Sequence, residues 1–216
     1  RSCAIVTDED VQIVESTSGF YKMQAQKRGE SRKEKLKMLY DRNMWVKSFY
    51  APHTLEIDFA LMNNRQNKEY INEVIELNYS RDCTIKEHKN NIDTGSDAAC
   101  ANTILMLARD MGKGWYATIL SNYIDSAVCI PQYILAAIAF ASREIINVDI
   151  IFKMVEYSLN KYKETKGGIK LKEKFQMLTD VTDKKSCIQN FRDAYEDDVV
   201  SKLLIEVDKY CESWCE

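Results

Sequence analysis

Glycine and proline are scarce in this chain, which has seven glycines and two prolines among 216 residues. Both residue types disfavour helix interiors, so their scarcity leaves long stretches free to be helical. The chain also lacks any sustained alternation of apolar and polar residues, which is the pattern of a half-buried strand. These absences predict an all-α fold, a compact multi-helix bundle of about seven to nine helices.

Histidine is equally scarce, and the motifs of common catalytic and cofactor sites are missing. His53 and His88 are the two histidines, and each lies in a stretch typical of a solvated turn. The cysteines form no CxxC pair, so no zinc site is expected. Gly112-Lys113-Gly114 lacks the other residues of a phosphate loop and is typical of a helix C-cap. The sequence therefore predicts no metal, no cofactor and no enzyme.

An excess of charge of one sign and long apolar runs are also absent. Lysine and arginine number 30 against 33 aspartates and glutamates, so the formal net charge is −3 and no nucleic-acid binding is expected. The longest apolar run, 133–141, is far shorter than the roughly 20 residues that cross a bilayer. We expect a soluble protein with no membrane span.

Capping residues and hydrophobic spacing divide the chain into helices. Residues 130–146 are apolar on every side and are expected to form a central helix surrounded by the others. The polar stretch 81–96 is expected to be the longest loop and the place where a single domain, 1–216, would divide into two layers. Gly29 and the pair Gly167-Gly168 are expected to end helices. The expected helices cover 7–27, 31–51, 54–78 with a break near 63–64, 96–112, 115–124, 130–146, 149–162 and 170–177. The last expected helix begins at 183 or 185 and ends at 215.

Seven cysteines are the most informative residues present, because several lie near the chain ends. They favour a secreted protein stapled by disulfides over a cytosolic protein with cysteines in its core. Cys211 and Cys215 are four residues apart on one helix face, so each is expected to bond a different partner. The chain starts at Arg1, as expected after signal cleavage or trimming, and Asn78 opens a glycosylation sequon with Tyr79 and Ser80. The disulfide candidates are Cys3, Cys83, Cys100, Cys129, Cys187, Cys211 and Cys215.

Aromatic side chains and one basic stretch are the functional candidates. Twelve tyrosines, seven phenylalanines and three tryptophans exceed the needs of one core helix, and aromatic surface anchors protein partners well. The basic stretch 22–37 is the one local patch suited to an anionic partner such as a sulfated glycan. The aromatic candidates are Trp45, Phe49, Tyr50, Trp115, Tyr116 and Tyr133, and the basic candidates are Lys27, Arg28, Arg32 and Lys33.

These features lead to two main hypotheses of function. The first is a secreted, non-catalytic helical binding protein that captures a host or tissue protein factor or a small apolar ligand. The second is an intracellular regulator that binds a partner's amphipathic helix in a groove. The stretch 110–115 resembles the first homology region of Bcl-2-type proteins in preceding an apolar helix, but it lacks the Asn-Trp-Gly-Arg core of that region, so no residue roles carry over. Weak binding of a polyanion through 22–37 is a further alternative.

Overall fold

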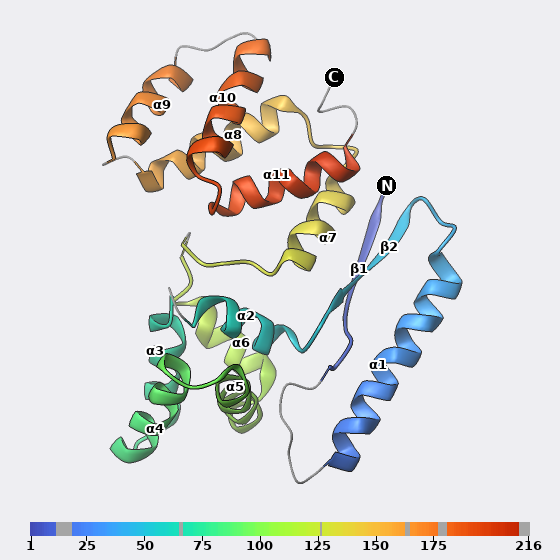
Figure 1. Ribbon diagram of the computed structural model, residues 1–216, viewed down its shortest axis with the longest axis vertical. Helices are drawn as coiled ribbons and strands as arrows, with labels where there is room; N and C mark the ends of the chain where they lie inside the picture. The colour runs from blue at the N-terminus through green and yellow to red at the C-terminus, as the bar shows by residue number, and fades with distance from the viewer. Residues whose placement is uncertain (12–18, 65–66, 126, 163–164, 177–180, 212–216) are drawn as a thin grey trace. The chain divides into compact units, whose positions relative to one another are not determined.

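The computed structural model describes residues 1–11, 19–64, 67–125, 127–162, 165–176 and 181–211, and these residues are mostly helical, as predicted (Figure 1). They form eleven α-helices, more than the seven to nine expected. The elements are β1 Cys3–Asp8, α1 Gly19–Tyr40, β2 Val46–Ala51, α2 Leu55–Asn63, α3 Glu69–Asn78, α4 Asp82–Asp93, α5 Asp97–Met111, α6 Lys113–Ser121, α7 Gln132–Ser142, α8 Val148–Leu159, the 3-10 turn Asn160–Tyr162, α9 Lys166–Gln176, α10 Val181–Ala194 and α11 Val199–Tyr210.

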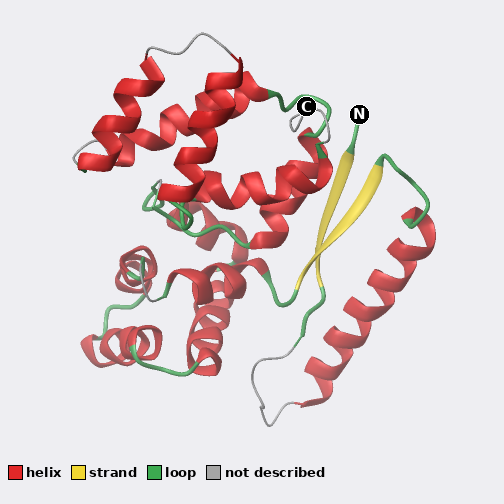
Figure 2. Ribbon diagram, turned by 45° about the horizontal axis from the view of Figure 1, so that its top comes forward, coloured by secondary structure: helices red, strands yellow, loops and turns green. Residues whose placement is uncertain are grey.

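The two strands, β1 and β2, were not predicted from the sequence (Figure 2). The Cys3 N–H donates to the Trp45 carbonyl at 2.7 Å, and the Glu9 N–H donates to the Ala51 carbonyl at 2.8 Å. The residue numbers of donor and acceptor increase together from the first of these hydrogen bonds to the second, so the strands are parallel. Helix α1 is the crossover connection between them. Short runs rich in β-branched and aromatic residues favour strands here, and this preference prevails over the capping pattern that predicted a helix from residue 7.

The chain divides into two compact units. We call Val6–Asp41 with Tyr50–Pro131 the central unit, and Arg1–Ile5, Arg42–Phe49 and Gln132–Glu216 the C-terminal unit. The stretch 81–96 is not the dividing point, because it lies wholly within the central unit. A single domain over 1–216 stays a prediction.

The core of the central unit gathers around α5, against which α2, α3, α4 and α6 pack. The expected break near 63–64 is confirmed, since α2 ends at Asn63. The Ser96 hydroxyl accepts from the Ala99 N–H at 3.3 Å at the start of α5, and Gly112 ends α5 with a positive φ of 82°. Both caps agree with the sequence prediction. Fully buried side chains of this core include Ile71, Val74, Ile75, Cys100, Ile104, Leu107 and Tyr116.

The polar stretch predicted as a loop is instead helix α4. Ile85, His88 and Ile92 recur at intervals of three and four residues, and His88 and Ile92 are buried against the rest of the unit. The prediction was wrong because only two of these three side chains are aliphatic, and the lysines between them obscured the helical period.

Hydrogen bonds from the buried Asn63 and the half-buried Tyr70 hold the loop that follows α6. The Asn63 Nδ2 donates to the carbonyls of Phe59 at 2.8 Å and Cys129 at 2.9 Å, while its Oδ1 accepts the Cys129 N–H at 2.8 Å. The Tyr70 hydroxyl donates to Asp125 Oδ1 at 2.5 Å. Burial, followed by this hydrogen bond, raises the pKa of Tyr70 to about 12.

In the C-terminal unit, α7 packs on α11 and α8 packs on α10. The apolar segment forms α7, which is shorter than the expected 130–146 and is not covered on every side. Leu135 and Phe140 are buried, but Ile138 is 45% exposed. The all-round burial predicted for this helix is therefore wrong, because an apolar residue on a helix need not face the core.

Two turns in the C-terminal unit also differ from the prediction. The last helix is not continuous, because Asp198 begins a new helix, α11, by accepting the Val200 N–H at 2.8 Å. Gly167 and Gly168 lie inside α9 and do not end a helix. A Cβ on Gly168 would lie 2.1 Å from the Tyr162 carbonyl oxygen, so glycine is needed for close approach of two backbones.

No disulfide joins two cysteines among the described residues, so the expected stapling has no support in the structure. Cys3 and Cys83 are exposed, Cys129 is half-buried, and Cys100, Cys187 and Cys211 are buried. Cys215 lies outside the described residues, so the separate partners predicted for Cys211 and Cys215 stay a prediction. Within the described part of the chain, no helix combines the length and apolarity that crossing a bilayer requires.

Candidate functional site

The strongest candidate site is the exposed face of α1. This helix carries seven lysine and arginine residues against two glutamates, in a chain whose net charge is −3. Its side chains between residues 27 and 39 are mostly exposed. Positive charge is therefore concentrated on one exposed element, which raises the local attraction for anions above that of the chain as a whole.

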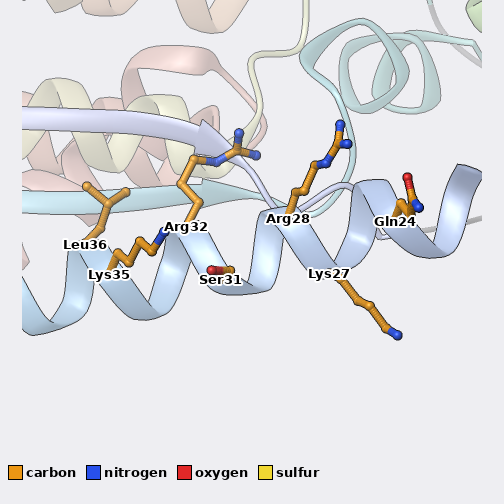
Figure 3. A pocket seen from close by; sticks show the side chains of 7 residues that line it. All are labelled: Gln24, Lys27, Arg28, Ser31, Arg32, Lys35 and Leu36. Atoms are coloured by element: carbon orange, nitrogen blue, oxygen red, sulfur yellow. The ribbon is translucent and has the colours of Figure 1, made fainter.

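One face of α1 borders an open hollow of about 660 Å³ (Figure 3). The lining residues recur at intervals of three and four, as one helix face requires. In Figure 3 the Arg28 and Arg32 side chains extend to the same side of the helix, and Lys27 extends to the opposite side. Cationic groups thus extend from both sides of the helix. The lining residues are Gln24, Lys27, Arg28, Ser31, Arg32, Lys35 and Leu36.

A neighbouring face of α1 is held against the acidic segment Asp8–Asp10. Gly29 is buried, and a Cβ at this position would lie only 2.2 Å from the Glu9 carbonyl oxygen. Arg32 donates to the Asp8 carbonyl at 2.7 Å and to Asp10 Oδ2 at 3.3 Å. The sequence predicted that Gly29 ends a helix, but Gly29 lies within α1. It is the point where the helix backbone and the strand backbone touch.

Lysine and aspartate side chains complete this contact. Lys33 forms an ion pair with Glu9, and its Nζ lies 5.0 Å from the centroid of the Tyr50 ring. Asp10 has a positive φ of 57°, a conformation that aspartate tolerates better than most residues. Burial, and then the neighbouring Asp10 carboxylate, raise the pKa of Asp8. Arg32 and Lys33 are thus partly neutralised by the chain itself.

Of the cations that border the hollow, Lys27, Arg28 and Lys35 are left for an external ligand. All three are exposed, and none forms an ion pair with another described residue. Of the four basic residues predicted, Lys27, Arg28 and Arg32 border the hollow, whereas Lys33 lies on the docked face. The other lining residues lie within the predicted basic stretch 22–37, but their common face was not recognised because the helix was expected to stop at Gly29. A continuous helix over 19–40 would have placed them on one face.

The six aromatic candidates are divided between the two units, and two of them are buried. Tyr50, Trp115 and Tyr116 belong to the central unit, where Tyr116 is buried in the core and Trp115 is exposed. Burial raises the pKa of the Tyr116 phenol. These positions leave Trp115 as the exposed aromatic of this group.

The remaining aromatic candidates, Trp45, Phe49 and Tyr133, belong to the C-terminal unit. Phe49 is buried, and its ring centroid lies 5.9 Å from that of Phe140 and 6.3 Å from that of Tyr210. Tyr133 packs against the same cluster. These aromatics fill the contact between β2, α7 and α11, so core packing explains Phe49 and Tyr133.

Two cations cover the exposed side of this aromatic cluster. The Arg143 guanidinium carbon lies 5.6 Å from the Trp45 ring centroid and 4.6 Å from that of Phe140. The Lys47 Nζ lies 4.5 Å from the Tyr210 ring centroid and also donates to the Tyr210 hydroxyl at 3.1 Å. Trp45 is half-exposed and already has a cationic partner.

Both histidines are placed differently from the prediction of solvated turns. The His53 Nδ1 lies 2.6 Å from Asp58 Oδ1, and Asp58 is buried. His88 is buried, with its ring centroid 4.7 Å from that of Tyr79. Among the described residues, no side chain other than Asp58 hydrogen-bonds the His53 ring, so the pair lacks the nucleophile that a catalytic relay requires.

The buried carboxylate of Asp198, in the C-terminal unit, is a structural group. It accepts hydrogen bonds from the Ser158 hydroxyl at 2.9 and 2.8 Å, from Lys161 Nζ at 3.1 Å and from the Tyr162 hydroxyl at 3.0 Å. Burial, followed by the nearby Asp198 charge, raises the pKa of Tyr162. With the Val200 N–H as a further donor, every acceptor direction of this carboxylate is used, which leaves no free oxygen for chemistry.

Metal and thiol chemistry receive no support from the described side chains. No group of three histidine, cysteine, aspartate or glutamate residues within them is arranged to hold a metal ion. Burial raises the pKa of Cys100, which disfavours the reactive thiolate. Asn78, the sequon residue, is half-buried at the end of α3, and its glycosylation stays a prediction.

Comparison of the chain with models of protein families, with curated proteins and with solved structures found no match.

Proposed function

We propose that this protein is a non-catalytic binding protein that captures an anionic macromolecule through the exposed face of α1. The observation that carries the proposal is the set of three exposed cations, Lys27, Arg28 and Lys35, along one open hollow. Exposed charges that no neighbour neutralises are available to an incoming ligand at little desolvation cost.

The aromatic hypothesis, in which a protein factor or a small apolar ligand binds aromatic surface, has less support from the geometry. Its six residues are divided between the two units, and Phe49 and Tyr116 are buried. We retain secretion and a binding role without catalysis as part of the proposal. Counting free thiols in the denatured, unreduced protein tests secretion separately, since a secreted form would pair some of its cysteines.

The binding proposal is tested by fluorescence anisotropy with labelled poly-L-glutamate and a labelled heparin oligosaccharide as polyanion probes. An exposed ion pair contributes about 0.2–1 kcal/mol, so reversing three charges should cost about 2 kcal/mol, which is about 30-fold in Kd. Raising the salt concentration should weaken wild-type binding steeply. The test variant is Lys27→Glu/Arg28→Glu/Lys35→Glu.

A matched control changes three other exposed lysines and so lowers the net charge equally, from −3 to about −9. The control should retain most of the wild-type affinity, because its charges lie elsewhere. Equal losses in the two triple variants would mean that overall charge, not the α1 face, attracts the probe. The control variant is Lys86→Glu/Lys153→Glu/Lys170→Glu, at positions that are exposed and outside α1.

A further inference from the structure

The basic face of α1 does not stay basic along its whole length. Leu36 borders the hollow at its C-terminal end. Just beyond it, Met38 is 79% exposed and Leu39 is 69% exposed. Residues three and four positions apart share a helix face, so Leu39 continues the row of Arg32, Lys35 and Leu36. The exposed face is therefore cationic over its first turns and apolar over its last.

A purely polar polyanion would leave this apolar end uncovered. Sulfated glycans carry few apolar groups able to cover Met38 and Leu39, and large exposed apolar side chains next to one another mark surfaces that bind partners. A peptide can supply carboxylates and apolar side chains in one short segment. The charge and hydropathy of the α1 face thus fit a peptide better than a glycan.

The chain itself shows how α1 binds an acidic peptide segment. Along its docked face, Arg32 takes the Asp8 carbonyl together with the Asp10 carboxylate, and Lys33 pairs with Glu9. The α1 side chains thus bind a backbone carbonyl and two carboxylates of one non-helical segment. The exposed face offers the same kinds of side chain without such a segment among the described residues.

Resting on the proposed function, we infer that the partner of the α1 face is an extended acidic peptide segment that also carries apolar side chains. Its carboxylates pair with Lys27, Arg28 and Lys35, and its apolar side chains cover Met38 and Leu39. From residue 27 to residue 39 the helix rises about 18 Å. An extended peptide covers that length in about six residues.

The test measures binding of three labelled probes to the full chain by fluorescence anisotropy. The first is the hexapeptide Asp-Glu-Asp-Gly-Leu-Leu, and the second replaces both leucines with serine; each is synthesised in both chain directions. The third is a heparin-derived hexasaccharide. We expect the leucine peptide, in one direction, to bind about tenfold more tightly than its serine counterpart, because partly burying two leucines favours binding.

The variant Met38→Ser/Leu39→Ser isolates the apolar end of the face. Both side chains are largely exposed, so the change should leave the fold intact, which circular dichroism checks. We expect it to lower the affinity for the leucine peptide to that for the serine peptide and to leave the serine peptide unchanged. Equal binding of the two peptides, or no effect of this variant, would overturn the inference while leaving anion binding in place.

The other outcomes separate the inference from the function on which it rests. Tighter binding of the hexasaccharide than of the leucine peptide would assign the face to a glycan and reject the peptide. If no probe responds to reversal of Lys27, Arg28 and Lys35, the proposed function fails together with the inference.

Discussion

Replacing Asp198 by alanine should be among the most damaging single changes in the C-terminal unit. The side chain of Asp198 is 1% exposed and accepts hydrogen bonds from four groups. Its removal leaves the buried Ser158 hydroxyl and the Lys161 ammonium without their acceptor and removes the N-cap of α11. Hydrogen bonds to a charged group contribute about 1.5–3 kcal/mol each, and breaking a buried ion pair costs about 3–5 kcal/mol.

Since these terms share one side chain, they do not add, and we expect a total loss of about 3–5 kcal/mol in the free energy of unfolding. Urea denaturation followed by circular dichroism measures it. With a slope of about 2 kcal/mol per molar urea, the midpoint should fall by about 2 M. Asp198→Asn keeps the shape of the side chain, but its amide NH2 group would face two groups that are themselves hydrogen-bond donors. This variant should lower the free energy of unfolding by more than about 1 kcal/mol, but by less than Asp198→Ala does.

The adjacent Asp197 provides a matched control. Its side chain is 103% exposed, and its carboxylate pairs with Lys202 across the surface at 3.3 Å. Asp197→Ala should therefore change the stability by less than about 0.5 kcal/mol. If Asp197→Ala and Asp198→Ala shift the urea midpoint equally, the buried network does not hold the helices together and the reasoning is refuted.

Three further predictions concern the central unit. Gly29→Ala should release α1 from the acidic segment and speed amide exchange across 24–36, whereas Gly114→Ala, where a Cβ meets nothing within 4 Å, should not. Asn63→Asp should cost about 3 kcal/mol in urea denaturation, because it turns a carboxylate oxygen toward two backbone carbonyls, whereas the exposed Asn102→Asp should be nearly neutral. The raised pKa of Tyr70 stabilises the fold below pH 10, and this contribution should be lost as the pH rises toward about 12. A Tyr70→Phe variant that loses stability over about pH 10–12 as steeply as the wild type would contradict this last prediction.

Much of the fold was predictable from local signals. Ser96 and Gly112 are helix caps that depend on nearby residues, and both are confirmed. The break after Asn63 is also confirmed, and the distant contact of Asn63 with Cys129 agrees with it. The predominance of helix also followed from the scarcity of glycine and proline. Local chemistry was sufficient in these places because no distant contact competed with it.

The errors occur where a distant contact decides the local structure. Gly29 has the sequence appearance of a helix end, but its lack of a side chain serves the approach of Glu9, about twenty residues earlier in the chain. The last helix was expected to continue through Asp198, but four distant or local donors make this residue the cap of a new helix. Neither requirement is visible in the periodicity of the sequence.

The candidate site was predicted only in part, because tertiary contacts decide which of its residues are available. The concentration of lysine and arginine over 22–37 identified the element that carries the candidate site, because composition alone shows local charge. Which cations remain exposed depends on the pairing of Arg32 and Lys33 with the acidic segment, and that is a tertiary contact. The same holds for the aromatic candidates, since Phe49 and Tyr116 are buried by packing that the sequence does not specify, and their binding role stays a prediction.

The most direct test of anion binding is to map the bound surface by nuclear magnetic resonance. Isotope-labelled protein is titrated with poly-L-glutamate at low salt, and the change in the chemical shift of each assigned backbone amide is measured. The account predicts that the largest shifts fall within residues 24–39 and include Lys27, Arg28 and Lys35, and that they disappear when salt is added. Shifts centred on Trp45 and Arg143, or no saturable shifts in α1, would contradict it.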